Sequence, residues 1–187
     1  MKTRFFVAIN FPEETKEEIS GLIDKLRVEH PQIRWEKTEN IHLTLKFLSW
    51  TEEKKIKKIL EGMKKSAFGI KPFGFKPEKL GYFLSQSLIV WIGVNAQEGL
   101  FQISRNLENE MKKLGFAKEK RVFSPHITIG RARKISPRKK WQSIAEEIKN
   151  FPTSSFSKFQ VKEVILMKSQ LTPKGSIYSV IDRILLE

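Results

Sequence analysis

The sequence predicts an α+β fold with two similar lobes, each an antiparallel sheet with helices on its outer face. Four segments with apolar residues three and four positions apart, as on one face of a helix, alternate with short strand-like runs. A strand containing His-x-Thr-x, followed within ten residues by a capped helix, occurs near residue 42 and again near residue 126. Duplication of one unit would explain this recurrence. Since no linker divides the chain, we expect one two-lobed domain over residues 1–187.

The strands are predicted from runs of apolar or alternating residues. They cover residues 4–9, 33–35, 41–48, 88–94, 121–131, 156–168 and 177–184, and the Pro- and Gly-rich stretch 71–81 is expected to form short strands with turns.

The helices are predicted from their apolar spacing and from residues typical of helix ends. The first runs from about Pro12 to just before Pro31, and Thr51 is expected to cap the second. The third covers residues 97–114 and the fourth begins at Ser136-Pro137. All four are apolar on one face, so each should lie on a sheet.

The composition excludes several kinds of site. The chain has no cysteine and only three histidines, which lack the spacing of zinc ligands, so neither a metal nor a cofactor is expected. The formal charge of +14 predicts attraction to polyanions, although a solvated Lys- and Glu-rich surface would carry the same charge.

The sequence contains no apolar run near the roughly 20 residues that a membrane helix needs. Its beginning runs directly into a strand without the apolar region of a secretion signal. We therefore expect a cytoplasmic protein without a membrane partner, and a monomer.

The two His-x-Thr-x motifs, residues 42–45 and 126–129, are the strongest functional signal. Side chains two positions apart in a strand share a face, so His42 lies beside Thr44 and His126 beside Thr128. A single His-x-Thr on a strand is usually an ordinary polar face. Two copies in a chain with three histidines indicate a site with paired imidazoles.

Two imidazoles suit in-line displacement at phosphorus. One, neutral, removes a proton from the attacking water or hydroxyl, and the other, protonated, gives a proton to the departing oxygen. The hydroxyls of Thr44 and Thr128 can bind the non-bridging oxygens and hold the phosphorus between the rings. Because the pattern is symmetric, it does not say which histidine is the acid.

Arg131 is a candidate for stabilising the charge of the phosphate. It lies an odd number of residues from His126, and a regular strand would place it on the opposite face. A bulge or strand end at Gly130 would be needed to bring the guanidinium into the site.

These residues resemble the two-histidine phosphoesterase superfamily and, within it, the RNA 2′,3′-cyclic phosphodiesterases, also called 2′-5′ RNA ligases. The resemblance extends over nearly the whole chain. It rests on Phe5–Ile9, Glu39–Leu48, Ser124–Arg131 and Leu171–Tyr178.

The resemblance implies two pseudo-symmetric lobes around a central cleft, each contributing one motif. It implies a hydrolase that opens RNA 2′,3′-cyclic phosphate ends to 2′-phosphates without a metal, and that can also join RNA halves, notably tRNA halves, by a 2′-5′ linkage. By the convention of the family, His42 would be the proton donor and His126 the proton acceptor.

Further substrate-binding candidates are aromatic and basic. Tyr82 and Phe83, beside a glycine in a turn-rich stretch, could stack on a base. Arg133 belongs to a basic cluster just past the second motif that could contact an RNA backbone. His30, at a helix end, is expected to be structural.

Two other functions remain open on the sequence. The chain could be a non-catalytic RNA- or nucleotide-binding module in which the histidines only contact phosphate. Alternatively, the same chemistry could act on a 2′-5′ oligonucleotide or a small cyclic nucleotide.

Overall fold

The computed structural model describes residues 2–133, 137–173 and 175–187, apart from the side chain of Arg133. The strands are β1 (Lys2–Asn10), β2 (Arg34–Trp35), β3 (His42–Glu52), β4 (Phe73–Leu84), β5 (Ser87–Ala96), β6 (His126–Arg133), β7 (Phe159–Val161), β8 (Glu163–Thr172) and β9 (Gly175–Leu185). The helices are α1 (Glu13–Glu29), α2 (Ile56–Ala67), α3 (Glu98–Lys113) and α4 (Arg138–Lys149), with the short 3-10 turns η1 (Thr38–Asn40) and η2 (Glu53–Lys55).

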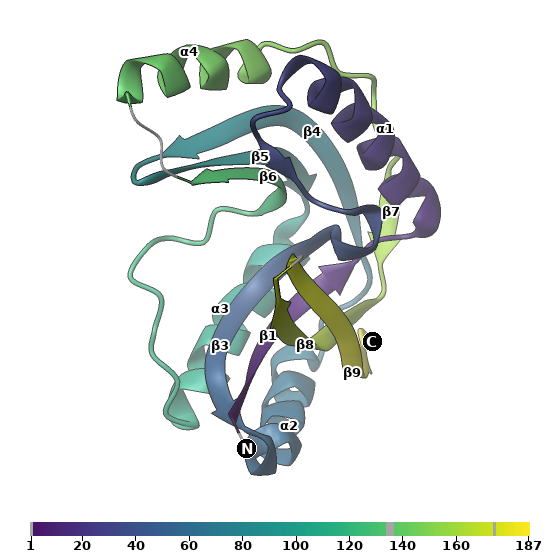
Figure 1. Cartoon of the computed structure of the whole chain (residues 1–187). Helices are drawn as coiled ribbons and strands as arrows, with labels where there is room; N and C mark the ends of the chain where they lie inside the picture. Colours follow the sequence, from purple (N-terminus) through teal and green to yellow (C-terminus); the bar gives the residue numbers. More distant parts are fainter. Residues whose placement is uncertain (1, 134–136, 174) are drawn as a thin grey trace.

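The strands form one curled sheet in the order β7-β4-β5-β6-β3-β1-β8-β9, with β2 added to β6 (Figure 1). Every pairing in the sheet is antiparallel. The two strands that begin with the histidines, β3 and β6, lie next to each other at its centre. The predicted α+β class with antiparallel strands is therefore confirmed, and the two halves share a continuous sheet.

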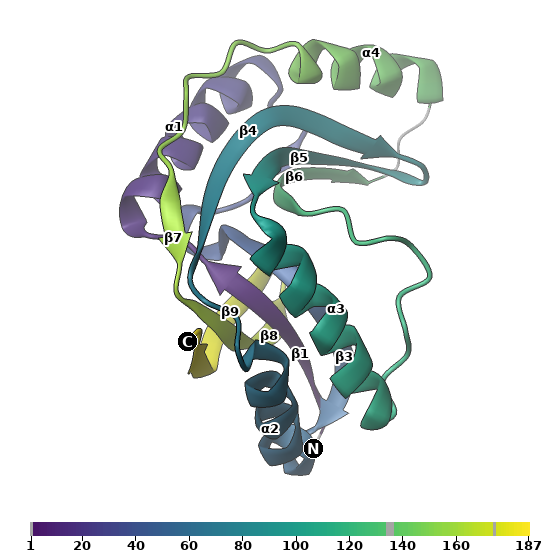
Figure 2. The same cartoon turned by 180° about the vertical axis from the view of Figure 1, so that it is seen from behind.

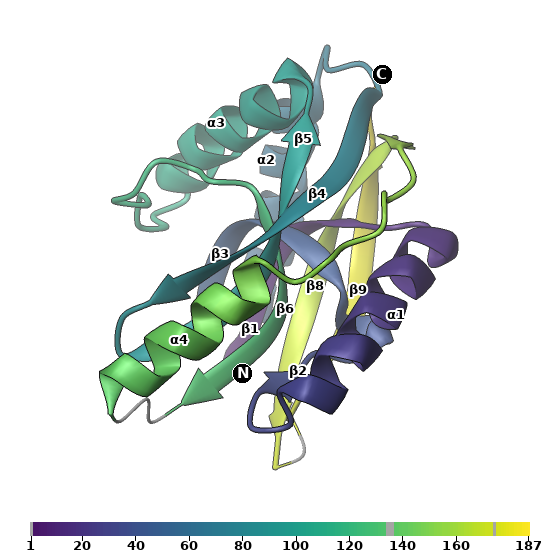
Figure 3. The same cartoon turned by 90° about the horizontal axis from the view of Figure 1, so that it is seen from above.

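The helices cover one face of the sheet. Helices α1 and α4 lie over the half that contains β4, β5 and β6, and α2 and α3 lie over the half that contains β1 and β3 (Figures 1 and 2). Figure 3, seen from above, shows α1 and α4 side by side on their half. One apolar core fills the space between helices and sheet, and its members include Leu43, Ile127 and Ile129.

Among the described residues, the buried apolar side chains of the opposite face form a small cluster, made of Phe6, Ala8, Ile165 and Met167 with Tyr178 against it. We call this side the open face. No helix within the described residues is long and apolar enough to cross a membrane.

Three predicted elements differ from the observed ones. Residues 121–125 are not part of a strand, because β6 begins at His126, directly after Pro125, which has no N–H to offer a ladder. Residues 71–81 were expected to be short strands with turns, but Phe73–Leu84 is one long strand, and the register shift after Pro77 absorbs the irregularity. The segment 156–168 is divided between β7 and β8.

The predicted helix caps were only partly correct. Gly115 follows α3 with φ 85°, as expected of a helix stop. Thr51 does not cap α2: it lies within β3, and its hydroxyl donates to the carbonyl of Leu48 at 2.7 Å. Pro137 precedes the first helical residue of α4, and Ser136 lies outside the described residues.

A buried ion pair joins β3 to α3. The register between β1 and β3 shifts between Lys46 and Thr44, so Leu45 is an extra residue and Lys46 turns toward the helices. The Lys46 ammonium donates to Glu108 Oε1 at 2.9 Å and to the carbonyl of Ala117 at 2.7 Å. Glu108 also accepts the N–H of Glu119. The pair therefore anchors the start of the segment that leads from α3 to β6.

We predict that Glu108→Gln lowers the free energy of unfolding by about 3 kcal/mol, because it leaves the fully buried Lys46 ammonium without a countercharge. Glu110→Gln on the same helix is the control. Its partner Lys113 is exposed, and loss of that pair should cost less than about 1 kcal/mol. Urea unfolding of both variants at pH 7 measures the difference. Equal losses would show that the Lys46 pair contributes no more than a surface pair.

Candidate active site

The two His-x-Thr-x motifs meet at the centre of the sheet. Strands β3 and β6 pair antiparallel at Leu43 and Ile127, the residues that directly follow the two histidines. Both of these apolar side chains are completely buried in the core. An antiparallel register through this pair sets His42 beside Thr128 and Thr44 beside His126, on the open face. A local two-fold axis therefore relates the motifs.

Backbone carbonyls fix the orientation of both imidazoles. His42 Nδ1 lies 2.6 Å from the carbonyl oxygen of Asn40, and His126 Nδ1 lies 2.7 Å from that of Ser124. A carbonyl only accepts, so Nδ1 carries the hydrogen in both rings. In the neutral form each Nε2 then holds a lone pair. His42 Nε2 lies 3.0 Å from the Thr44 hydroxyl, and both atoms can face a phosphate.

Aromatic rings surround both histidines. The His42 ring lies 4.9 Å from Phe6 and 5.3 Å from Tyr178, centroid to centroid. The His126 ring lies 5.1 Å from Phe83, edge to face, and 6.2 Å from Trp91. These aromatic rings exclude water from the sides of the imidazoles, so the imidazoles make their polar contacts through their ring nitrogens.

The environment of His42 disfavours its charged form. The pKa of His42 is lowered to about 4, chiefly by burial; the bond to the Asn40 carbonyl opposes the shift, and the positive charges of Arg131 and Lys16 add to it. His42 is therefore neutral near pH 7 in the free protein. Its protonated form would need a negative charge close by, such as that of a bound phosphate.

The structure places Arg131 on the same face as the histidines. Thr128 pairs with Trp91 and Gly130 with Val90, so Ile129 is an extra residue in β6. Before this bulge the even-numbered residues face the open side, and beyond it the odd-numbered residues do. The break that Arg131 requires thus lies at Ile129. Gly130 has another role: a Cβ there would collide with the ring of Trp35, which packs directly on this backbone.

Glu36 is the acidic neighbour of Arg131. Glu36 Oε1 lies 3.7 Å from Arg131 Nε, and the arginine side chain is 47% exposed. Burial raises the pKa of Glu36, and the charges of Arg131 and Arg34 oppose this. Burial and the nearby Glu36 also raise the pKa of Tyr178, the partner of the His42 ring. Glu36 thus holds the Nε side of the Arg131 guanidinium, while the group stays accessible to an anion.

The remaining candidate residues for substrate binding lie on different faces of the sheet. Phe83 lies on the open face against His126. Tyr82 lies on the other side of the strand from Phe83, because neighbouring residues of a strand point to opposite sides: it faces α4, and its hydroxyl donates to Glu146. The backbone of Arg133 belongs to β6, but its side chain lies outside the described part of the chain.

Sequence reasoning missed several contributors to the site. Phe6 sits in an unbroken apolar run, Phe5–Ile9, and such a run signals a strand covered on both faces. The carbonyls of Asn40 and Ser124 left no signal in the sequence, because any residue has a carbonyl. Across the described residues, no cluster of three or more His, Asp or Glu side chains has the arrangement of a metal site.

A family model described as LigT like Phosphoesterase matches the chain twice, over residues 9–91 and 92–178. The chain therefore belongs to this family of phosphoesterases. Each match contains one His-x-Thr-x motif, in agreement with the recurrence seen in the sequence.

Individual relatives match over nearly their whole length. The chain is 36% identical to the RNA 2′,3′-cyclic phosphodiesterase of Methanocaldococcus jannaschii over 95% of this chain and 98% of that protein. It is 36% identical to the protein of the same name from Thermotoga maritima, over 95% and 92% respectively. The solved structure of E. coli LigT complexed with 3′-AMP superposes with a TM-score of 0.77 at 25% identity, covering 100% of this chain and 99% of that one.

The pKa of His42 predicts a specific dependence of stability on pH. Between pH 6.5 and about 4 the unfolded chain binds a proton at this position and the folded chain does not. Stability contributed by His42 is therefore complete above pH 6.5 and falls as the pH drops toward 4, by about 1.4 kcal/mol per pH unit at most.

The comparison variant is His42→Asn, whose amide can still donate to the Asn40 carbonyl. The free energy of unfolding of the wild-type protein should decline more steeply below pH 6.5 than that of the variant, with a difference of about 3 kcal/mol by pH 4. Parallel curves over this range would show that the folded state does not depress the pKa of His42.

Proposed function

We propose that this protein hydrolyses RNA 2′,3′-cyclic phosphate ends to 2′-phosphates by acid–base catalysis with His42 and His126. The observation that carries the proposal is the pairing at Leu43 and Ile127, which sets two imidazoles diagonally across neighbouring strands, each beside the Thr of the other motif, on the open face. The names of the relatives from M. jannaschii and T. maritima support the substrate class. The net charge of +14 suits a polyanionic ligand.

In the proposed reaction, the neutral imidazole of His126 takes a proton from water as the water oxygen attacks phosphorus. The bond from phosphorus to the 3′ oxygen breaks, and protonated His42 gives its proton to that oxygen, so that a 3′-hydroxyl and a 2′-phosphate remain. These roles follow the convention of the family. A 5′-hydroxyl of a second RNA in place of water would give a 2′-5′ phosphodiester, which is the proposed route to ligation.

The surroundings of the site suit this division of labour. The hydroxyls of Thr44 and Thr128 would donate to the non-bridging oxygens, and Arg131 would offset the charge that grows on them. The low pKa of His42 means that the donor must gain its proton together with the substrate, whose negative charge favours the imidazolium. Proton uptake would then be coupled to binding.

We predict that His42→Ala and His126→Ala each lower kcat about 10²–10⁴-fold, as expected for loss of one acid or base, and change substrate affinity little. His30→Gln is the control, because the third histidine is buried outside both His-x-Thr-x motifs, and its carbonyl, which any residue retains, accepts from the Trp35 indole. Release of 2′-phosphate from an oligoribonucleotide 2′,3′-cyclic phosphate, measured with EDTA present, tests the proposal. Binding without turnover by the wild-type protein would favour the non-catalytic alternative.

A substrate with sulfur in place of the 3′ bridging oxygen assigns the two roles. A thiolate leaves without protonation, so the variant that lacks the proton donor should recover most of its rate on this substrate, while the variant that lacks the base should not. We expect recovery for His42→Ala and not for His126→Ala. The reverse result would exchange the roles and keep the two-histidine mechanism.

A further inference from the structure

Two large aromatic side chains of β3 lie exposed outside the catalytic site. Phe47 is 58% exposed and Trp50 is 60% exposed. They lie on the strand that begins with His42, five and eight residues further on. Exposed aromatic rings on a sheet are what proteins use to stack the bases of single-stranded nucleic acid.

Two irregularities in β3, at Leu45 and Leu48, place both rings on the open face. Residues three apart in a regular strand point to opposite sides. Here Phe47 pairs with Phe6 and Trp50 with Arg4, so Leu48 is an extra residue and both rings share the face of Phe6. Ser49 adopts φ 52°, a conformation that non-glycine residues seldom adopt and that costs about 1–3 kcal/mol. The buried hydroxyl of Thr51 holds this bulge through the Leu48 carbonyl.

The rings continue outward from the catalytic histidine. The Phe6 ring lies 4.9 Å from His42 and 6.2 Å from Phe47, centroid to centroid. Beyond them, the Arg4 guanidinium lies 5.6 Å from the centre of the Trp50 ring. A path along the open face of β3 thus connects His42 with Phe47 and Trp50.

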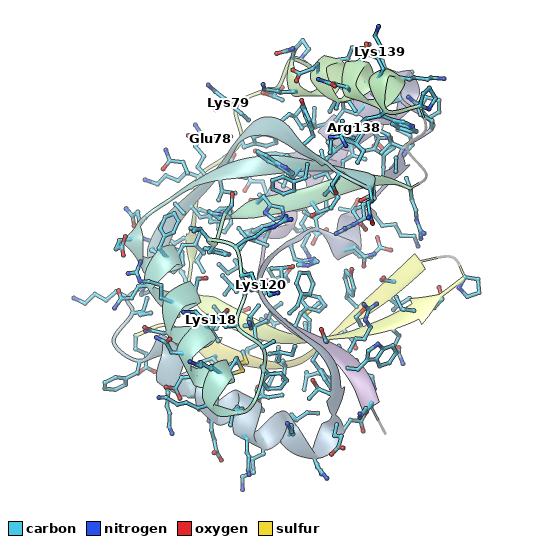
Figure 4. The ribbon with its side chains drawn as sticks, turned by 90° about the vertical axis from the view of Figure 1, so that its left-hand side faces the viewer. Glu78, Lys79, Lys118, Lys120, Arg138 and Lys139 are labelled. Atoms are coloured by element: carbon cyan, nitrogen blue, oxygen red, sulfur yellow. The ribbon has the colours of Figure 1, made fainter. Side chains whose placement is uncertain are left out.

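Basic residues border this path on one side. A hollow of about 570 Å³ separates β3 from the segment between α3 and β6 and is lined by Phe47, Leu48, Ser49 and residues 115–121. That segment carries Lys118, Lys120 and Arg121, all exposed, against one acidic residue, Glu119. Figure 4 looks onto the side of the molecule where the segment runs and labels Lys118 and Lys120. The buried pair of Lys46 and Glu108 fixes its first residues.

We propose that this surface, comprising Phe47, Trp50, Lys118, Lys120 and Arg121, binds the single-stranded RNA that lies 5′ of the cyclic phosphate. Two bases stack on Phe47 and Trp50, and the intervening phosphates face the three cations. The inference rests on the proposed function and adds to it a preference for a chain over a mononucleotide. The ring of Phe6 separates Phe47 from His42, and Trp50 lies three residues further along the strand, so both rings lie beyond the groups that flank the His42 imidazole.

The test compares two substrates in the variant Phe47→Ala/Trp50→Ala. For a single-stranded oligoribonucleotide 2′,3′-cyclic phosphate, kcat/KM should fall about tenfold for each lost stacking platform. For the corresponding nucleoside 2′,3′-cyclic phosphate it should stay within twofold of wild type, which also shows that the variant is folded. Phe68→Ala is the control, since Phe68 is 87% exposed at the end of α2. Equal effects on both substrates, or none on either, would overturn the inference.

Binding is measured separately, with an oligoribonucleotide that ends in a 3′-hydroxyl and is not hydrolysed. Weaker binding by the double variant but not by Phe68→Ala supports the surface even if the wild-type protein proves inactive on cyclic phosphates. Absence of turnover alone would count against the proposed function only. Unchanged binding would reject the surface.

The basic side is tested by Lys118→Ala/Lys120→Ala. If both lysines contact phosphates, the slope of log affinity against log salt concentration should become less steep by roughly 1.4, at about 0.7 per contact to a single strand. An unchanged slope would show that the RNA does not pass between β3 and this segment.

Discussion

The architecture of the site depends on a single backbone pairing between Leu43 and Ile127. This pair joins β3 to β6 and thereby joins the two halves of the sheet. Its side chains are completely buried beneath the histidines, so the core fixes the backbone from which both imidazoles project. A side chain of a different volume at either position would disturb the core and shift one motif against the other. The stability of the core and the geometry of the candidate site therefore depend on the same pair of residues.

The symmetry of this pairing does not extend to the electrostatics. Both imidazoles donate from Nδ1 to a carbonyl two residues earlier in the chain. Only the ring of His42 lies between Phe6 and Tyr178 and close to the positive charges that depress its pKa. A difference in surroundings of this kind would favour different protonation states for the two imidazoles, as the proposed acid and base roles require.

The sequence was sufficient wherever regular periodicity decides the structure. Alternation placed His42 with Thr44 and His126 with Thr128, and the helical spacing located all four helices. It failed where a local contact overrides propensity. Thr51 looked like a helix cap, but its hydroxyl is used by the bulge at Leu48. Tyr82 looked available to a base, but its place in a strand longer than expected turns it to Glu146 on the far side.

Bulges in β3 and β6 explain the side-chain positions that regular strand alternation does not predict. Lys46 lies an even number of residues from His42 and Thr44, and a regular strand would place all three on one face. The extra residue Leu45 instead turns Lys46 toward Glu108 on α3. Ile129 brings Arg131 onto the face of the histidines.

The bulge at Leu48 reverses the alternation a second time, so Trp50 stays on the open face together with Phe47. Each bulge weakens the ladder locally, and those at Leu45 and Ile129 give Lys46, Phe47 and Arg131 positions that a regular strand would deny them. The strands with the His-x-Thr-x motifs therefore combine a regular beginning, which sets the imidazoles, with bulged continuations. Those continuations decide which further groups face the open side. A comparable site on regular strands would have Lys46 where Phe47 now lies and would have Arg131 buried against the core.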